Sequence, residues 1–150
     1  MDQAIIVLDA NVLVKVFHEE HDTEHAKNLL KSCTRQQTTI LVPEHFLYEV
    51  VSVCQYLGIG IPQVLDFFDV LKSSILTIAA PQRDTWLLAE KIARQGHEKS
   101  GFPSMYDSIY HGLAIHGDGT FVTADKRYFA KAQPFKHICL LKDWQTLFEH

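Results

Sequence analysis

The segment Ile5-Ile6-Val7-Leu8-Asp9 constrains the fold more than any other part of the chain, because four consecutive apolar residues lead directly into a carboxylate. An unbroken apolar run, rather than an alternating one, is typical of a central strand in a parallel sheet that helices cover on both faces. In such sheets ligands bind outside the carboxyl ends of the strands. Asp9 is therefore expected at the edge where a ligand would bind.

The rest of the chain alternates between strand patterns and helical patterns. The expected strands are residues 4–9, 38–42, 75–79, 120–123 and 137–141. The expected helices are residues 11–17, 22–36, 43–58, 62–71, 81–94, 103–116, 126–132 and 144–148, and residues 95–101 form the most loop-like stretch. This order predicts an α/β fold, a three-layer α/β/α sandwich with a mainly parallel sheet of about five strands.

Some local features of the helices also follow from the sequence. Asp22 or Thr23 is expected to cap the second helix, and Pro43 is expected at the first position of the third. The apolar faces of residues 46–57 and 64–71 could pack in the core, or form a dimer face or a groove for a partner helix. In the helix at 81–94, the side chains expected to point inward are Trp86, Leu87, Leu88 and Ile92.

Chain length and cysteine usage favour one intracellular domain. The chain has 150 residues, so residues 1–150 are expected to form a single domain, which would bury roughly 70% of its extended surface without needing disulfides. Cys33, Cys54 and Cys139 are scattered and lack C-x-x-C spacing. We expect them to be small buried thiols in a reducing cytoplasm.

The charge balance and the length of the apolar runs exclude some classes of protein. A net charge of -4, from 14 basic and 18 acidic side chains, is not typical of a general nucleic-acid binder. It is compatible with a nucleic-acid enzyme that uses a divalent metal, or with a basic protein partner. No apolar run approaches the roughly 20 residues that span a bilayer, and no basic region resembles the start of a signal peptide. We therefore expect no membrane association.

Four carboxylates occupy special positions in the expected fold. Asp9 ends the first strand, Glu49 lies in the helix after the second, Asp107 lies in the first turns of the helix at 103–116, and Asp125 follows the fourth strand. An α/β sheet directs such strand ends and helix starts to one edge. Carboxylates gathered there would repel one another, and a divalent cation would relieve this repulsion. Oxygen ligands favour Mg²⁺ or Mn²⁺ over Zn²⁺.

Each of these carboxylates also has an ordinary structural explanation. Asp9 and Asp125 could cap the helices that follow them, because aspartate is a favoured N-cap residue. Asp107 fits a capping box that begins at Ser104. Glu49 lies at helical spacing from His45 and Ser52, which is typical of a solvated face.

The ordered set Leu8-Asp9-Ala10-Asn11, Glu49, Tyr106-Asp107 and Thr123-Ala124-Asp125 resembles the PIN domain family, and within it the VapC-type toxin ribonucleases. The resemblance covers essentially the whole chain and implies an α/β/α fold and a Mg²⁺- or Mn²⁺-dependent ribonuclease. It also implies that Asp9, Glu49, Asp107 and Asp125 are catalytic and hold the metal, with Asn11 and Thr123 as supporting polar residues.

Several residues near the proposed site have open roles. Some relatives carry a further acid two residues after the last aspartate, but this chain has Arg127 there, so two fully occupied metals are not assumed. Lys126 and Arg127 could contact phosphate or be solvated residues at a helix start. His111 could orient Asp107 or be an ordinary polar residue of the same helix. His21 and His25 have the spacing of two zinc ligands, but no second cluster completes the set.

The leading functional hypothesis is a metal-dependent endoribonuclease that hydrolyses RNA phosphodiester bonds as the toxin component of a type II toxin–antitoxin pair. An RNA substrate, a small antitoxin protein and a homodimer are implied by the resemblance. The alternative is a PIN-like module that binds RNA or protein with weak or no catalysis. A small phosphatase is a third possibility, but Asn11 breaks the D-x-D motif that such an enzyme would need at Asp9.

Overall fold

The sheet places the strand at Ile5–Leu8 at its centre, as its unbroken apolar run predicts. The computed structural model describes residues 4–96 and 101–149. Within these residues the strands, in sheet order, are β3 (Leu76–Ile78), β2 (Thr39–Val42), β1 (Ile5–Leu8), β4 (Thr120–Thr123) and β5 (Ile138–Leu140). All neighbouring strands pair in parallel. The predicted parallel sheet of about five strands is confirmed.

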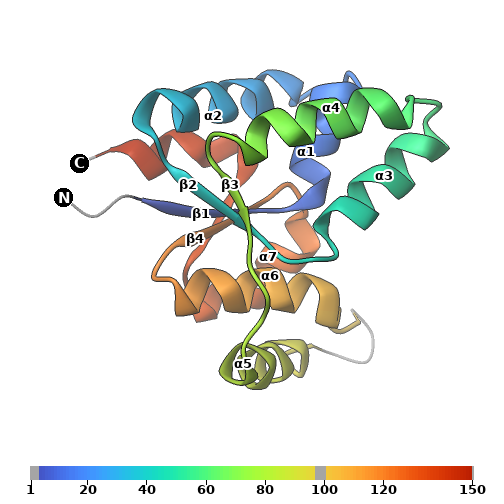
Figure 1. Cartoon of the computed structure of the whole chain (residues 1–150). Coiled ribbons are helices and arrows are strands. Elements are labelled where there is room, and N and C mark those ends of the chain that lie inside the picture. Colours follow the sequence, from blue (N-terminus) through green and yellow to red (C-terminus); the bar gives the residue numbers. More distant parts are fainter. Residues whose placement is uncertain (1–3, 97–100, 150) are drawn as a thin grey trace.

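Helices cover both faces of the sheet, so the predicted α/β/α sandwich is also confirmed. The α-helices are α1 (Ala10–Phe17), α2 (Thr23–Gln36), α3 (Phe46–Tyr56), α4 (Ile61–Lys72), α5 (Arg83–Ala93), α6 (Met105–His116) and α7 (Lys126–Ala132). Two 3-10 helices, η1 (Gln133–Phe135) and η2 (Leu141–Phe148), flank β5. In Figure 1, α2 and α4 lie above the sheet, and α6 lies below it with α5 on its outer side.

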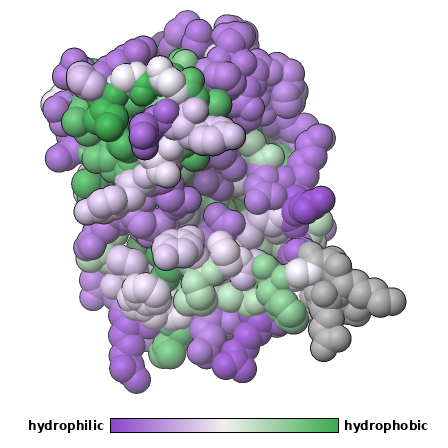
Figure 2. Space-filling view, turned by 90° about the vertical axis from the view of Figure 1, so that its right-hand side faces the viewer, coloured by the Kyte–Doolittle hydropathy of each residue, from purple (hydrophilic) through white to green (hydrophobic). Residues whose placement is uncertain are grey.

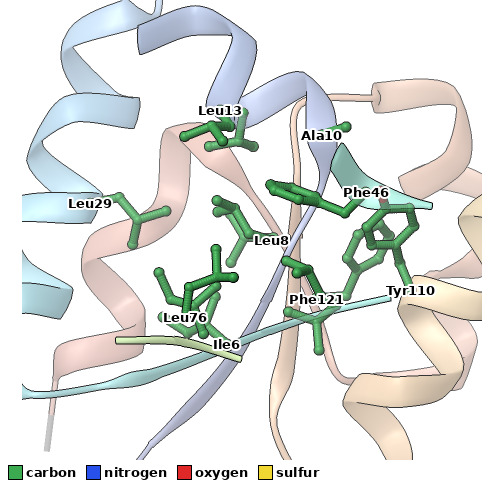
Figure 3. Close-up of a cluster of buried hydrophobic side chains, with 14 of the residues drawn as sticks. Ile6, Leu8, Ala10, Leu13, Leu29, Phe46, Leu76, Tyr110 and Phe121 are labelled. Carbon is green, nitrogen blue, oxygen red and sulfur yellow. The ribbon is translucent and has the colours of Figure 1, made fainter. Parts of the chain in front are cut away.

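The core is built on both faces of β1, which is why this strand does not alternate between apolar and polar residues. Ile6 is 1% exposed, and Val7 and Leu8 are completely buried. Figure 3 shows side chains from several helices and from the neighbouring strands meeting around them. Tyr110 of α6 stacks on Phe121 of β4, with 5.6 Å between the ring centroids. The aromatic part of this core holds Tyr110 rigidly beneath the carboxyl edge of the sheet.

The predicted inward face of α5 is partly wrong. Trp86 and Leu87 are 51% and 54% exposed, whereas Thr85, Ala89 and Ile92 are buried. The reason is that α5 packs on α6 instead of on the strands, and it does so through small residues. A Cβ atom at Gly112 of α6 would lie only 3.2 Å from the Thr85 side chain. This close approach sets the rotation of α5 and leaves its two largest apolar side chains in solvent.

The start of the third helix and the capping of the second also differ from the sequence-based expectation. The third helix begins at Phe46, because Pro43 belongs to a turn in which the Phe46 N–H donates to the Pro43 carbonyl at 3.0 Å. Asp22 does occupy the N-cap position of α2, but its side chain makes no capping hydrogen bond. The predicted loop at 95–101 lies partly outside the described residues.

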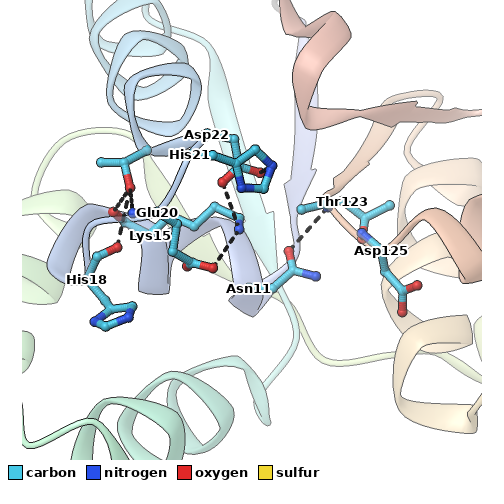
Figure 4. Close-up of polar contacts among 10 residues, drawn as sticks. Asn11, Lys15, His18, Glu20, His21, Asp22, Thr123 and Asp125 are labelled. Atoms are coloured by element: carbon cyan, nitrogen blue, oxygen red, sulfur yellow. Dashed lines mark hydrogen bonds and ion pairs between the residues drawn. The ribbon is translucent and has the colours of Figure 1, made fainter.

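The carboxylate of Asp22 is instead bound to a buried lysine. Lys15 Nζ lies 2.9 Å from Asp22 Oδ1 and 3.4 Å from Glu20 Oε1 (Figure 4). Burial alone would raise the pKa of Asp22, but the hydrogen bond and the positive charge of Lys15 outweigh it and lower that pKa. These ion pairs tie the connection between α1 and α2 to α1 itself. No helix among the described residues has the length and apolar character needed to cross a membrane.

Gly119, in the turn that leads into β4, packs directly against the backbone of β1. A Cβ atom there would lie 2.5 Å from the Ile5 carbonyl oxygen, so Gly119→Ala must displace one strand from the other. We predict that Gly119→Ala lowers the free energy of unfolding by about 1–3 kcal/mol, as measured by urea denaturation. Gly60→Ala is a control without such a clash, because a Cβ atom there would lie 3.9 Å from Pro62, and it should lose only the smaller N-cap preference for glycine at the start of α4. Equal stability of the two variants would contradict this packing account.

Candidate functional site

Asp9 stands at the carboxyl end of β1, where the strand passes directly into α1. Its side chain is almost fully buried, at 5% exposure. Asp9 Oδ2 accepts a hydrogen bond from Thr123 Oγ1 at 2.7 Å, and Oδ1 accepts one from the backbone N–H of Asn11 at 3.4 Å. Asp9 is therefore the N-cap of α1, as its structural explanation requires. It is also a buried carboxylate that the end of the neighbouring strand holds in place.

Asn11 and Thr123 join the ends of β1 and β4. Asn11 Oδ1 accepts the backbone N–H of Ala124 at 3.3 Å (Figure 4). Thr123 Oγ1 donates to Asp9 and accepts the backbone N–H of Asp125 at 3.0 Å. These contacts fix the position of Asp9 relative to the β4–α7 connection, which is what the supporting roles expected for Asn11 and Thr123 would require.

Asp125 acts as the N-cap of α7. Its Oδ1 accepts the backbone N–H groups of Arg127 and Tyr128, both at 3.0 Å. The capping role expected for Asp125 from the sequence is therefore filled by one oxygen of its carboxylate, Oδ1. Lys126 and Arg127 are exposed in the first turn of α7, beside this cap.

The side chain of Glu49 is 37% exposed, so the solvated-face interpretation describes only part of its surroundings. Tyr110 Oη donates to Glu49 Oε1 at 3.0 Å, and His45 Nε2 lies 3.3 Å from the same oxygen. The His45 ring packs edge-to-face against Tyr110 and against the exposed Tyr106, at centroid distances of 4.9 and 5.3 Å. Glu49 thus reaches the carboxyl edge of the sheet within a small aromatic cluster.

Sequence reasoning missed Tyr110 as a contact of the site. Its position in α6 marks it as a core residue, and its hydroxyl partner is 61 residues away in the chain. The contact of His45 with Glu49 had a visible signal, because the two residues are four apart on one helix.

Asp107 lies in the first turn of α6. Its backbone N–H donates to Ser104 Oγ at 3.0 Å, so Ser104 caps the helix as predicted. The carboxylate of Asp107 lines a pocket of about 530 Å³ together with Asp9 and Glu49. Asp125 lies outside the lining of this pocket. The structure therefore brings three of the four predicted carboxylates to one cavity and places the fourth beside it, at the start of α7.

The carboxylates that share this pocket destabilise one another's charge. Burial, and then the negative charge of Asp107, raise the pKa of Asp9 to about 7, against the hydrogen bond from Thr123. Burial also raises the pKa of Glu49, with repulsion from Asp107 adding to it and the Tyr110 hydrogen bond opposing it. The pKa of Asp107 is raised by burial and by Asp125, against a hydrogen bond from Ser104. Such a site favours a bound proton or a cation.

The chemistry of the donors fits a hard divalent cation. Asp9, Glu49 and Asp107 offer only oxygen, and Thr123 and Tyr110 orient two of them, as hydrogen-bonded neighbours of metal ligands commonly do. In the described part of the chain, no three acidic, histidine or cysteine side chains are grouped closely enough to hold an ion as they stand. A bound ion would therefore have to draw these side chains together.

His111 and His21, two of the histidines considered above for a role in metal binding or in orienting Asp107, do not take part in the site. His111 is fully buried; its Nε2 donates to the Lys136 carbonyl at 2.6 Å, and Nδ1 accepts from Tyr128 Oη at 2.9 Å. Both ring nitrogens are thus used within the core, and His111 does not orient Asp107. His21 is exposed, and its nearest charged partner is Asp22 at 3.9 Å.

The fold is that of known toxin proteins. VapBC2 from Rickettsia felis, solved with a DNA fragment from its promoter, is 17% identical with a TM-score of 0.64, covering 91% of this chain and 96% of that one. VapC20 from Mycobacterium tuberculosis, described as a sarcin–ricin loop cleaving toxin, is 14% identical with a TM-score of 0.64, covering 83% and 93%. A toxin–antitoxin complex from Klebsiella pneumoniae is 15% identical with a TM-score of 0.65, covering 91% and 97%.

Membership of a family follows from the sequence itself. None of the curated protein sequences matches the chain. The family model described as "PIN domain", however, matches residues 6–133, which include most of β1 and the whole of α3, α6 and α7. The resemblance stated from the motifs is thereby confirmed, and this chain belongs to the PIN domain family.

Proposed function

We propose that this protein is a Mg²⁺- or Mn²⁺-dependent endoribonuclease that hydrolyses RNA phosphodiester bonds as the toxin of a type II toxin–antitoxin pair. The observation that carries the proposal is the shared pocket of Asp9, Glu49 and Asp107 at the carboxyl edge of the sheet. Membership of the PIN family, and the likeness of fold to a protein described as an RNA-cleaving toxin, support it.

The residues of the site would have different roles in binding the ion and in positioning its ligands. Asp9, Glu49 and Asp107 would hold the ion, with Asp125 contributing from the start of α7. When bound, a divalent ion supplies Lewis-acid chemistry and lowers the pKa of a water molecule that can attack phosphorus. Thr123 keeps Asp9 turned toward the pocket, and Tyr110 does the same for Glu49.

Basic groups near the site would position the RNA. Lys126 and Arg127 are exposed in the first turn of α7, directly after Asp125. Phosphate groups on the strand being cleaved could contact these side chains, and such contacts fix register without reading sequence. The acidic site could then bind the polyanionic RNA, because the bound cation and the side chains of Lys126 and Arg127 supply positive charge.

An antitoxin partner is the second part of the proposal. A groove of about 750 Å³ runs between α2 and α4, with Leu30, Phe67 and Val70 among its apolar lining residues. Its basic rim consists of Lys27, Lys31 and Arg35. An apolar segment with acidic flanks would fit this groove in both shape and charge. Two of the solved structures of similar fold are toxin–antitoxin complexes by description or by name.

The remaining parts of the proposal concern assembly and location. A homodimer would cover exposed apolar side chains such as Trp86 and Leu87 on α5. Residues 1–150 would act as a single domain. A reducing cytoplasm suits its free buried cysteines, which are Cys33, Cys54 and Cys139.

One observation favours the alternative of a PIN-like binding module. Among the described residues no ready-made group of metal ligands exists. The same pocket could serve a protein that binds Mn²⁺ and RNA without cleaving the RNA. Binding of both without cleavage would therefore identify the module and not the enzyme.

We predict that Asp9→Asn abolishes Mn²⁺-dependent cleavage of structured RNA, because it removes a charged ligand from the pocket. Thr123→Val should lower kcat by roughly 10–100-fold, the usual effect of losing a residue that orients a metal ligand. Asp118→Asn is the matched control, since Asp118 is exposed in the turn before β4, at the opposite end of that strand. Cleavage by Asp9→Asn at the wild-type rate would reject the site.

The raised pKa of Asp9 predicts an unusual dependence of stability on pH in the metal-free protein. The pKa rises from 3.8 to about 7, so the folded state retains a proton that the unfolded chain has released. This stabilisation is complete below the unfolded pKa and is lost as the pH rises through about 7. From pH 5 to pH 8, wild type should lose roughly 1–3 kcal/mol of unfolding free energy relative to Asp9→Asn.

Adding Mn²⁺ should reverse this trend, because the ion binds the ionised carboxylates and competes with protons. The measurement is urea denaturation of both proteins across the pH range, with and without Mn²⁺. If the unfolding free energies of wild type and Asp9→Asn change in parallel with pH in the absence of metal, Asp9 is ionised across the whole range and the prediction is wrong.

The groove proposal predicts which surface substitutions weaken antitoxin binding. Val70 is 63% exposed and lines the groove, so Val70→Glu should weaken binding of the proposed antitoxin by at least about tenfold. Leu65→Glu is the control, because Leu65 is 39% exposed on the same helix but does not line the groove. Isothermal titration would measure both. If Val70→Glu binds the antitoxin with wild-type affinity, the antitoxin does not bind in this groove.

A further inference from the structure

We infer that the pocket beside the carboxylates contains a subsite for one unpaired nucleobase, and that Tyr56 supplies the ring on which this base stacks. The inference rests on the proposed ribonuclease function and adds a specificity-determining residue to it. The pocket that holds Asp9, Glu49 and Asp107 continues away from the sheet between α1 and α3. Its far end is lined by apolar and aromatic side chains, among them Val53, Tyr56 and Leu57.

One wall of the pocket is a single stripe of α3. Glu49, Val53 and Tyr56 line the pocket at positions i, i+4 and i+7, which lie on the same side of a helix. Tyr56 is therefore about 10 Å from Glu49 along the helix axis. A nucleotide whose phosphate lies at the carboxylates can place its own base, or the next one, at that distance.

The opposite wall is a stripe of α1 and offers no free cation. Asn11, Val14 and Lys15 line it, followed by His18 at the end of the helix. Lys15 is bound to Asp22 and Glu20, so its charge is already neutralised. With one apolar wall and a neutralised lysine, this end of the pocket suits the flat face of a base better than a phosphate group.

Tyr56 is presented as an open stacking surface. Its side chain is 90% exposed, although it belongs to the pocket lining, and it has no hydrogen bond or ring contact within the described residues. Figure 2 views the molecule from the side where the strands end, and hydrophobic residues gather at the upper left of this face, at the height of α3 and α4 in Figure 1. Exposed aromatic rings bind unpaired bases in many single-strand binding proteins.

The shape of the pocket selects an unpaired nucleotide. Two helices wall a space of about 530 Å³ that also contains the carboxylates. A base inside a duplex has both faces stacked and its pairing edge occupied, so it cannot enter such a space. A base in a loop or bulge can turn outward and insert.

Four proteins test the inference: wild type, Tyr56→Ala, Tyr56→Phe and Tyr48→Ala. Tyr48 is the matched control, because it is 79% exposed on the same helix but does not line the pocket. With Mn²⁺ and an RNA that contains an unpaired loop, Tyr56→Ala should raise KM by roughly 5- to 150-fold, the range expected for one lost base stack, with little change in kcat. Tyr56→Phe and Tyr48→Ala should behave as wild type.

A second readout uses single-stranded RNA oligomers with 2-aminopurine at successive positions, bound in Ca²⁺. Stacking should quench the fluorescence at one position, or two adjacent ones, with wild type and Tyr56→Phe but not with Tyr56→Ala. If wild type cleaves RNA and Tyr56→Ala has wild-type KM and quenching, the subsite is wrong and the ribonuclease stands. The subsite is equally overturned if Tyr56→Ala alters only dimerisation or antitoxin binding. If wild type neither binds nor cleaves RNA, the proposed function fails first.

Discussion

The buried carboxylate of Asp9 is the constraint on which the rest of the site depends. A charge at the end of a core strand is costly to bury unless polar groups or a cation accompany it. Here the hydroxyl of Thr123, at 2.7 Å, supplies part of this compensation, and the nearby Asp107 opposes it. The metal-free pocket therefore carries an electrostatic cost, and a divalent cation would relieve it. The hydrogen bonds between the ends of β1 and β4 keep Asp9 in place, and without them its side chain could turn into solvent.

The order of the strands determines which side chains can meet Asp9. Because β1 is central and β4 is its neighbour, Thr123 and the start of α7 lie directly beside it. Capping and metal binding are compatible at this edge. Asp125 uses one oxygen, Oδ1, for both capping hydrogen bonds, so its other oxygen carries no capping role. The same helix starts that complete the backbone hydrogen bonding thus provide the acidic groups of the proposed site.

Much of this architecture could be predicted from the sequence, because it follows from local patterns. The apolar run before Asp9 gave the central strand, and β4 and α7 have the predicted bounds. What could not be predicted depends on packing between distant segments. The rotation of α5 is set by contact with Gly112, and Glu49 accepts a hydrogen bond from Tyr110, which lies 61 residues away in the chain. Asp22 or Thr23 was expected to cap the second helix, but the carboxylate of Asp22 binds the buried Lys15 instead of the helix backbone.

The central claim is that these carboxylates converge on one divalent ion, and a crystal soaked with Mn²⁺ tests it most directly. The account predicts an anomalous density peak at the carboxyl edge of the sheet. Oxygens of Asp9 and Asp107 should lie about 2.0–2.6 Å from it, with Glu49 and Asp125 drawn toward the same ion. A fully soaked crystal with no peak there, or with Mn²⁺ bound only at other surface carboxylates, would contradict the account.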